Sequence, residues 1–306
     1  YMNSNKIKGN IFLLMTAMIW GFAFVAQRTV MVYMPPFLYS GIRMYVGTVS
    51  LIVIIIIANK VSIAKELAVE KKVRRKQTKE LLYSGMACGI AMFFAANLQQ
   101  IGLIFTTASK TAFITTLYIV LVPIMGVFMK HQITRNSWIG VLLSVIGLYL
   151  LCITDSFTIA LGDVFVLLSA IFWGIQILFM NYFVQKLMVA KVVAAQFFVA
   201  GTMSFMLSPV IDSYFNIHID AENFVDALPS ILYVGVISTA IAATFQGIGQ
   251  KYVKPTTASI ILSTESVFGA ICGCVFMKDM LSIREIFGCI FMFIAVLIAQ
   301  KQHKPN

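Results

Sequence analysis

Ten stretches of about 20 apolar residues follow one another along the chain, and this feature restricts the fold more than any other. A helix of this length covers the ~30 Å hydrocarbon core of a bilayer. The connections are mostly a few residues long, so no soluble domain fits between the stretches. We therefore expect an all-α polytopic membrane protein whose ten transmembrane helices lie at 10–32, 36–58, 81–103, 108–129, 136–154, 163–184, 192–211, 227–250, 256–276 and 283–300.

The composition agrees with a chain that has lipid as its main solvent. Of the 306 residues, 60% are hydrophobic and 11% are charged, and the mean hydropathy is +0.91. The apolar runs are continuous and do not alternate, which argues against barrel strands. The first stretch has no cleavage-type end and leads directly into the second, so we expect it to remain as a membrane anchor.

The basic residues are distributed unevenly between the two membrane faces. If the N-terminus lies inside, 18 of the 23 Lys and Arg residues lie on the cytoplasmic side. This asymmetry predicts cytoplasmic N- and C-termini in a bacterial-type plasma membrane. The run KKVRRK at 71–76 would lie near anionic lipid headgroups, so we expect a lipid bilayer and no nucleic acid as its partner. The basic residues outside the cytoplasmic set are Arg28, Arg43, Lys110, Lys278 and Arg284.

The sequence contains no motif typical of catalysis or of cofactor binding. A phosphate loop, a His-Glu metal signature and a Ser-His-Asp set are all missing. All five cysteines fall within the apolar stretches; Cys272 and Cys274 point to different helix faces and have no His nearby. We therefore expect no enzyme, no metal and no cofactor, and transport driven by a gradient or by exchange.

The two halves of the chain repeat each other. KGNIFLLMTAMIWGF at 8–22 aligns without gaps to LGDVFVLLSAIFWGI at 161–175, and TTAS at 106–109 recurs at 256–259. We expect two five-helix repeats, 1–155 and 156–306. Because five is odd, the second repeat enters the membrane in the opposite orientation. Inverted repeats are typical of secondary transporters, whose halves exchange inward-open and outward-open shapes around a midplane site.

With these features the chain resembles the EamA family of the drug/metabolite transporter superfamily, over nearly its whole length. The resemblance rests on the WG pairs at 20–21 and 173–174, GIRM at 41–44, GLIFTTASKTAFITTLYIVLVP at 102–123 and GQKYVKPTTASIILSTESVF at 249–268. Many members carry a proline soon after the position of Glu265, where this chain has Ser266. The resemblance implies ten spans and transport, often export, of a small metabolite.

Two charged residues fall inside the apolar stretches. An ionised side chain at mid-membrane costs at least ~2.5 kcal/mol, so it usually faces a cavity or a partner. Near the centre of the ninth stretch, Glu265 could contact substrate or a proton, which we favour, or be held by the hydroxyls of Ser263 or Thr264. Arg43 lies in the outer part of the second stretch, near enough to the interface to stay hydrated. It could snorkel, pair with a carboxylate or receive an anionic group, and we favour a structural or gating role.

Polar residues and two tryptophans recur at helical spacing, and we expect them to line a central pathway. Each hydroxyl or amide has the alternative of holding helices together, for ~0.6 kcal/mol. Pro123 frees the carbonyl of Ile119 beside Tyr118, where a kink could act as a hinge or be plain packing. The predicted substrate-binding residues are Glu265, Trp20, Trp173, Tyr118, Asn97, Gln100, Thr115, Gln176 and Gln246, and the predicted gating or structural residues are Arg43, Pro123 and Gln250.

The sequence thus predicts a secondary active transporter that moves a small metabolite, such as an amino acid or a derivative, by alternating access, and we expect export. Proton-coupled export of organic cations or drugs is the alternative within transport. A lipid scramblase or a non-transporting membrane protein is the alternative of another class. The pairs Gly85/Gly89 and Gly269/Gly273 allow close helix contact within the bundle or in a homodimer, so a monomer and a homodimer both remain possible.

Overall fold

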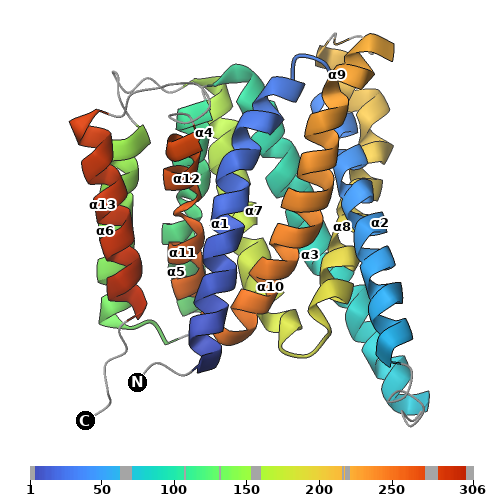
Figure 1. The fold of residues 1–306 in the computed structure, drawn as a ribbon, viewed down its shortest axis with the longest axis horizontal. Helices are drawn as coiled ribbons and strands as arrows, with labels where there is room; N and C mark the ends of the chain where they lie inside the picture. Colours follow the sequence, from blue (N-terminus) through green and yellow to red (C-terminus); the bar gives the residue numbers. More distant parts are fainter. Residues whose placement is uncertain are drawn as a thin grey trace.

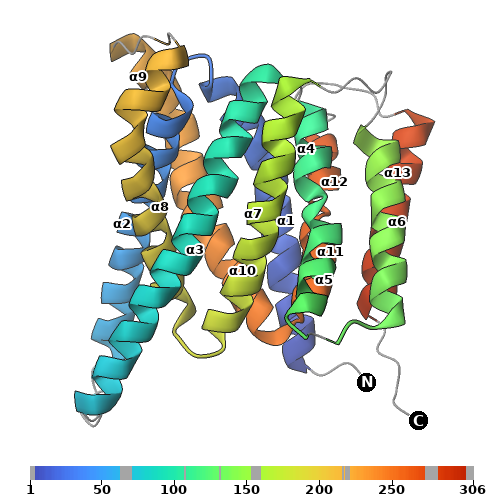
Figure 2. The ribbon, with the colours of Figure 1, turned by 180° about the vertical axis from the view of Figure 1, so that it is seen from behind.

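A computed structural model of the chain describes residues 4–62, 71–106, 108–130, 132–152, 160–215, 217, 221–272 and 282–300, and every element in these ranges is helical (Figures 1 and 2). The helices run up and down a single bundle. We call the end at which α1 begins and α13 ends the terminal end, and the opposite end the far end. The elements are α1 (Ser4–Val30), α2 (Pro36–Ser62), α3 (Lys71–Phe105), α4 (Ala108–Thr116), α5 (Tyr118–Phe128), α6 (Arg135–Cys152), α7 (Leu161–Val184), α8 (Val189–Ile211), the 3-10 turn η1 (Asp212–Phe215), α9 (Ala221–Leu232), the π-helix η2 (Tyr233–Ala242), α10 (Ala243–Tyr252), α11 (Pro255–Leu262), α12 (Glu265–Cys272) and α13 (Ile283–Gln300).

Among the described residues, eight helical segments are long and apolar enough to cross a membrane, and each overlaps a predicted stretch. The apolar part of α6, Arg135–Leu151, is shorter, and the ninth stretch is divided between α11 and α12. Helices suit this environment because they satisfy their own backbone hydrogen bonds in lipid. The helical membrane fold is confirmed, and the total of ten spans stays a prediction. Residues 153–154 and 273–276 of the predicted stretches, with Cys274, and also Lys278, lie outside the described residues.

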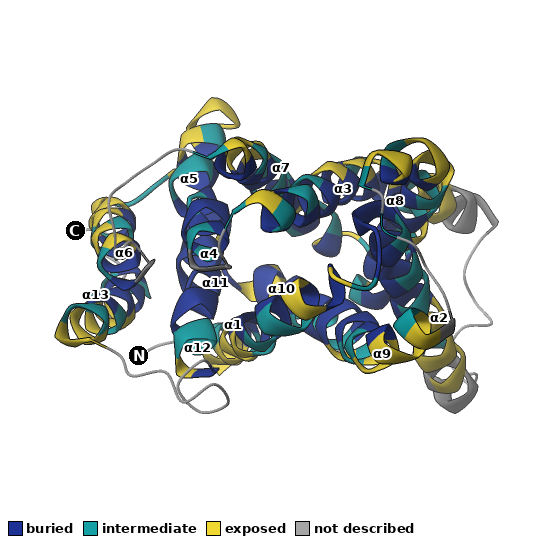
Figure 3. Cartoon of the chain, turned by 90° about the horizontal axis from the view of Figure 1, so that it is seen from above, coloured by how far each residue is buried: buried dark blue, intermediate teal, exposed yellow. Residues whose placement is uncertain are grey.

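The helices of the two halves pack against each other in pairs that the repeat relates. The second helices, α2 and α8, pack against each other, and so do the fifth helices, α6 and α13. Likewise α3 packs on α7, while η2 and α10 pack on α1. Seen from above, α6 and α13 lie at one edge of the molecule and α2 and α8 at the other, with α1, α4, α5, α7 and α10 to α12 between them (Figure 3). The repeat in the sequence thus reappears in the packing.

Two glycines mark close contacts between helices of the two halves. A Cβ on Gly89 would lie 2.6 Å from the Cβ of Val199, so α3 approaches α8 closely, and this predicted small-residue pair packs within the bundle. A Cβ on Gly21 would lie 2.6 Å from the carbonyl oxygen of Glu265 and 2.7 Å from the nitrogen of Gly269. Because no larger residue fits there, α1 lies directly against the ninth segment. Gly273 of the second predicted pair lies outside the described residues.

The fourth segment (α4 and α5) and the ninth segment (α11 and α12) are both broken near the middle. The first break is Leu117, between α4 and α5, and the second is Ser263 and Thr264, between α11 and α12. At both breaks the backbone N–H bonds the carbonyl three positions earlier, as in a 3-10 helix. These bonds run from Leu117 N to Ile114 O at 3.2 Å and from Thr264 N to Ile261 O at 3.2 Å. Hydroxyl side chains next to the breaks bond nearby carbonyls, an alternative to the regular helical ladder.

The break in the fourth segment is not where the proline predicts it. Pro123 lies inside α5, and the chain departs from helical form six positions earlier, at Leu117. The ninth segment breaks with no proline near the break, since its Pro255 is the first residue of α11. Hydroxyl residues at 115–116 and 263–264 precede or form the breaks in both halves, so they mark the positions better than the proline does. Tyr118 and Glu265 are the first residues of the helices that follow, α5 and α12.

Candidate functional site

Side chains from both halves of the chain meet in a small cavity beside the two helix breaks. Its volume is about 50 Å³, well below the ~300 Å³ at which ordinary ligand pockets begin. The walls come from α1, α2, α3, α4, α5, α7, α8, η2 and α12. The cavity is lined by Trp20, Phe24, Gln27, Arg43, Met92, Gln99, Thr115, Tyr118, Trp173, Ile177, Phe197, Ser238, Thr239 and Glu265.

The Glu265 carboxylate joins the two halves across this cavity. It is 4% exposed, and its Oε1 accepts a hydrogen bond of 3.2 Å from the Tyr118 hydroxyl. The hydroxyls of Ser263 and Thr264 donate to the carbonyls of Ile260 and Ile261 instead. The alternative in which these hydroxyls hold Glu265 is therefore not the arrangement found. The carboxylate sits where the second break meets the first.

Arg43 lies on the same cavity, which corrects the expectation that it stays hydrated near the outer interface. Its side chain is only 8% exposed, because α2 packs against α8 and η2 and encloses it. The guanidinium carbon lies 5.8 Å from the centre of the Tyr39 ring, within reach of a cation–π contact. No ion pair joins Arg43 to Glu265. A carboxyl group and a guanidinium group therefore line one small space.

The two tryptophans related by the repeat stand side by side in the cavity wall. The ring centres of Trp20 and Trp173 lie 5.9 Å apart, with planes tilted by 51°. The Trp20 indole N–H donates to the carbonyl of Ser238 at 3.1 Å, within the π-helix η2. Such irregular turns are frequent at functional sites, since they change which backbone groups are left to bind a partner. The second tryptophan has no such partner.

Three polar atoms around the cavity lack a hydrogen-bond partner among the described residues. They are the Nε of Arg43, the Nε1 of Trp173 and the Oγ1 of Thr239. A buried polar group without a partner costs ~1 to 3 kcal/mol. Because these atoms belong to three residues that line one space, a polar ligand or water in that space would satisfy them. These unpartnered atoms make the cavity the candidate site.

Four of the predicted substrate-binding residues do not line this cavity. Asn97 bonds the hydroxyl of Ser204 at 2.9 Å, and Gln100 bonds Gln27 at 2.5 Å. Gln246 donates to Gln176 at 3.1 Å, which donates to Gln196 at 3.1 Å, so these amides form a ladder between helices. These residues form hydrogen bonds between helices. This is the alternative role expected from the sequence for each polar residue at helical spacing.

Several lining residues are not among the predicted set. Gln99 lines the cavity in place of its neighbour Gln100, and its amide donates to the hydroxyl of Thr115 at 2.9 Å. Adjacent helix positions differ by about 100°, so an error of one residue turns a side chain away from the site. Gln27 and Thr239 stand in the polar stripes of their segments, and that pattern could have identified them. Phe24, Met92 and Phe197 carry no polar signal.

At the far end a polar cluster ties α7 to the end of α3. Asp163 accepts hydrogen bonds from the hydroxyl of Thr106 at 2.5 Å and from the nitrogen of Ala160 at 2.8 Å. The Lys110 ammonium lies 3.8 Å from the same carboxylate. The far end is therefore held together by charge-assisted hydrogen bonds, which are stronger than neutral ones.

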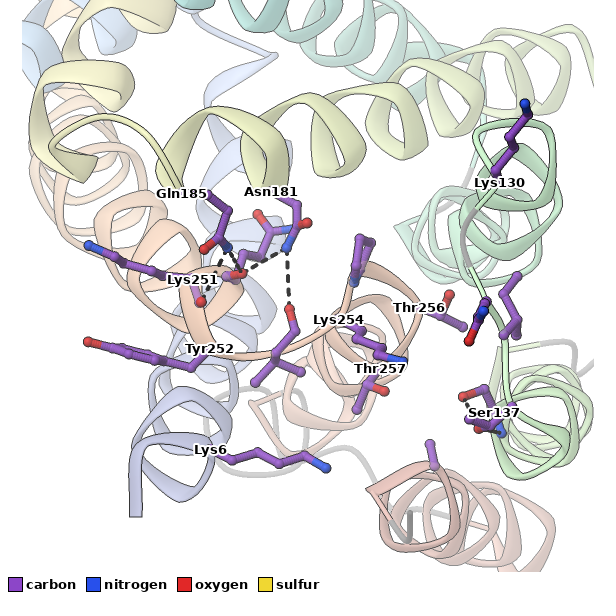
Figure 4. Close-up of a pocket in the computed structure, with 17 residues that line it drawn as sticks. Lys6, Lys130, Ser137, Asn181, Gln185, Lys251, Tyr252, Lys254, Thr256 and Thr257 are labelled. Atoms are coloured by element: carbon purple, nitrogen blue, oxygen red, sulfur yellow. Dashed lines mark hydrogen bonds between the residues drawn. The ribbon is translucent and has the colours of Figure 1, made fainter. Parts of the chain in front are cut away.

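At the terminal end, the residues that correspond to the Asp163 cluster do not form the same contacts. In the repeat, Asn10 corresponds to Asp163 and Thr256 to Thr106. Both polar atoms of the Asn10 side chain are buried and have no partner among the described residues. A pocket of about 580 Å³ opens beside Thr256 at this end (Figure 4). The contact that closes the far end is thus not made at the terminal end.

Gln250 lies between the terminal pocket and the central cavity. It lines the terminal pocket, and its amide donates to the carbonyl of Ile177 at 3.0 Å, while Ile177 also lines the cavity. The Asn181 amide donates to the carbonyl of Gln250 at 2.7 Å. These bonds place Gln250 in the layer that separates the two spaces.

The sequence pattern of the EamA-like transporter family matches this chain twice, over residues 7–153 and 160–300. An uncharacterized transporter of Archaeoglobus fulgidus is 24% identical over 294 residues, which cover 96% of this chain and 86% of that protein. The uncharacterized transporter YoaV of Bacillus subtilis is 20% identical over 291 residues, or 94% of each chain. A crystal structure of a protein at 14% identity has a TM-score of 0.72 and covers 95% of this chain and 96% of that chain, which shows a common fold.

These matches agree with what the sequence and the structure show independently. The two family matches together extend over nearly the whole chain. They fall on the two halves that repeat each other in sequence, and the helices of these halves are long and apolar enough to cross a membrane. The chain therefore belongs to the EamA-like transporter family and is a membrane transporter.

Proposed function

We propose that this transporter carries a small zwitterionic metabolite of the amino-acid class, and that Glu265 and Arg43 bind its two charges. The observation that carries the proposal is the presence of one carboxylate and one guanidinium on a single small cavity with no ion pair between them. A buried charge without an oppositely charged partner is costly, so both groups favour a ligand that brings the opposite charges. An ammonium group would bind Glu265, and a carboxylate would bind Arg43.

The other lining residues suit the same kind of ligand. The faces of Trp20 and Trp173 provide an apolar wall that also accepts a cation, and the unpartnered N–H of Trp173 can donate to a ligand oxygen. The cavity of about 50 Å³ is too small for most metabolites, so its walls must move when substrate binds. Breaks in the fourth and ninth segments provide short half-helices that can shift separately.

Transport by alternating access follows from the asymmetry between the two ends. The far end is tied by Asp163, whereas at the terminal end, which has the open pocket, the corresponding Asn10 side chain has no hydrogen-bond partner among the described residues. In an inverted repeat, exchanging these two arrangements closes the terminal end and opens the far end. With the basic residues on the cytoplasmic side of a bacterial plasma membrane, the pocket opens to the cytoplasm, and loading from that side gives export.

A binding experiment separates the two charged residues. L-amino acids should raise the unfolding midpoint of the purified chain, because a ligand of the folded state stabilises it. Glu265→Gln should bind about tenfold or more weakly and lose its preference for an amino acid over the matching acid without the amino group. Arg43→Gln should lose the preference over the matching amine without the carboxyl group. Glu222→Gln and Arg28→Gln remove the same charges at exposed positions and serve as controls.

The same variants are then tested for exchange of labelled amino acid in proteoliposomes. Both charge variants should lose exchange, and both controls should keep it. The proposal fails if Glu265→Gln and Arg43→Gln transport like the native chain, or if no zwitterion stabilises the native chain.

Export of organic cations remains the second candidate, because the carboxylate and the two indole faces would also suit a cation. Arg43 on the same cavity opposes it through like-charge repulsion. Competition by amines alone, without competition by amino acids, would favour this candidate. The polar side chains that line the cavity are buried between the helices, which favours a carrier over a scramblase.

A further inference from the structure

The pocket at the terminal end gathers positive charge, and none of the described residues that line it is acidic. Its volume is about 580 Å³, which is within the range of ordinary ligand pockets. Of the residues that line it, four are lysines, Lys6, Lys130, Lys251 and Lys254, and none is Asp or Glu. The pocket lies apart from the central cavity, beyond the layer that contains Gln250 and Ile177. It therefore needs an explanation of its own.

Two of these lysines converge. Figure 4 shows Lys6 from α1 and Lys254 from the start of α11 extending toward the same space, near Thr257 and Ser137. The charge of Lys254 acts unfavourably on Lys6, so the two ammonium groups are close enough to repel each other. The Lys6 ammonium is partly satisfied by the carbonyl of Gln300 at 3.4 Å, a neutral acceptor that leaves the charge in place. Two like charges that converge in this way favour an anion between them.

The start of α11 adds donors to the same space. Its first residue is Pro255, and the preceding Lys254 provides no side-chain cap. The backbone N–H groups of Thr256 and Thr257, at the second and third helical positions, have no acceptor within the helix. Both residues line the pocket. Uncapped N–H groups at a helix start attract negative charge, and here they add to the two lysines.

We propose that this pocket binds a phosphate group, carried either by an anionic lipid headgroup or by a soluble phosphate ester. Phosphate suits the site better than a single carboxylate, because it has more oxygens to share among two ammonium groups, hydroxyls and N–H groups. The pocket is lined by residues near the ends of α1, α5, α10 and α11, where lipid headgroups and soluble anions are both within reach. Bound phosphate would bridge α1 and α11, one helix from each half.

The test compares a pocket variant with a matched surface variant. Lys6→Gln with Lys254→Gln removes the converging charges and keeps a polar side chain at both positions. Lys8→Gln with Lys186→Gln removes two exposed lysines that do not line the pocket. The unfolding midpoint of each full-length chain is measured in neutral detergent with sodium phosphate against sodium chloride at equal ionic strength. A second series adds phosphatidylglycerol or phosphatidylcholine.

Phosphate or phosphatidylglycerol should raise the midpoint of the native chain and of the surface variant, with apparent affinity in the pocket variant lower by about tenfold or more. A rise with phosphatidylglycerol alone assigns the site to a headgroup, and a rise with inorganic phosphate assigns it to soluble phosphates. Equal shifts in all three chains, or no shift of the native chain with either probe, overturn the proposal. Lys254→Gln alone is measured as well, because it changes one exposed side chain and leaves α11 intact. Since the readout is binding and not transport, the result does not depend on the proposed substrate.

Discussion

At the residue scale, the repeat-related tryptophans have different environments, although they occupy equivalent positions in the two halves. Trp20 donates its N–H to the carbonyl of Ser238, whereas the N–H of Trp173 has no partner among the described residues. The first is therefore already part of the folded network, and the second is available to a ligand. Glu265 is also specific to one half. The corresponding positions of the first half, 115–117, contain no acidic residue.

Because only Trp20 has a hydrogen-bond partner, replacing each tryptophan with phenylalanine should have different effects at the two positions. Trp20→Phe breaks the bond to Ser238 and should lower the free energy of unfolding by about 1 kcal/mol. Trp173→Phe loses no hydrogen bond, so its stability without ligand should stay close to native while its affinity for substrate falls. Thermal unfolding with and without an amino acid distinguishes the two effects. Equal behaviour of the two variants would contradict the assignment of Trp173 to the substrate.

At the element scale, the broken fourth and ninth segments set the position of the site. Tyr118 and Glu265 begin the half-helices that follow the breaks, and their side chains meet at 3.2 Å. The contact depends on how closely α1 approaches the second break. A Cβ on Gly21 would overlap the backbone of Glu265 and Gly269, whereas a Cβ on Gly269 would meet Gly21 at an ordinary 3.5 Å.

The two glycines therefore provide a matched test. Gly21→Ala forces backbone atoms apart and should cost about 1 to 3 kcal/mol of stability, with a loss of substrate binding as Glu265 is displaced. Gly269→Ala should fold and bind like the native chain. Unfolding midpoints and ligand-induced shifts of both variants measure this. A tolerated Gly21→Ala would mean that α1 does not fix the break.

At the scale of the whole molecule, the two ends differ in their polar contacts, although the repeat places equivalent residues there. The far end has the Asp163 cluster, and the terminal end has the unpaired Asn10 and a wide pocket. Since the two positions are equivalent by sequence, the stability of each closed end should depend on which of them carries the carboxylate.

Exchanging the two side chains tests this idea. Asp163→Asn weakens the far-end cluster and should speed amide hydrogen exchange in 102–106 and 160–168, because local opening becomes easier. Asn10→Asp gives the terminal end a carboxylate acceptor and should slow exchange in 249–258. Lys110→Gln removes the ion pair at 3.8 Å and leaves the two hydrogen bonds to Asp163 in place, so it should have a smaller effect. Unchanged exchange at both ends in both variants would separate the Asp163 cluster from any role in closure.

The sequence by itself determined the properties that depend on local composition. The apolar stretches predict helices because a backbone in lipid must satisfy its own hydrogen bonds. Matching residues 8–22 and 161–175 predict the repeat, and Trp20, Trp173, Tyr118, Thr115, Arg43 and Glu265 are singled out by charge or polarity and found on one cavity.

Only the tertiary structure decided which side chains share a space. The depth of Arg43, the choice of Gln99 over Gln100 and the break at Leu117 all depend on helices distant in the sequence, because packing sets the rotation of each helix and where its backbone can depart from regular form. The terminal pocket is of the same kind. Lys6 and Lys254 converge only when the first and ninth segments lie side by side, and no local pattern near either lysine contains that fact.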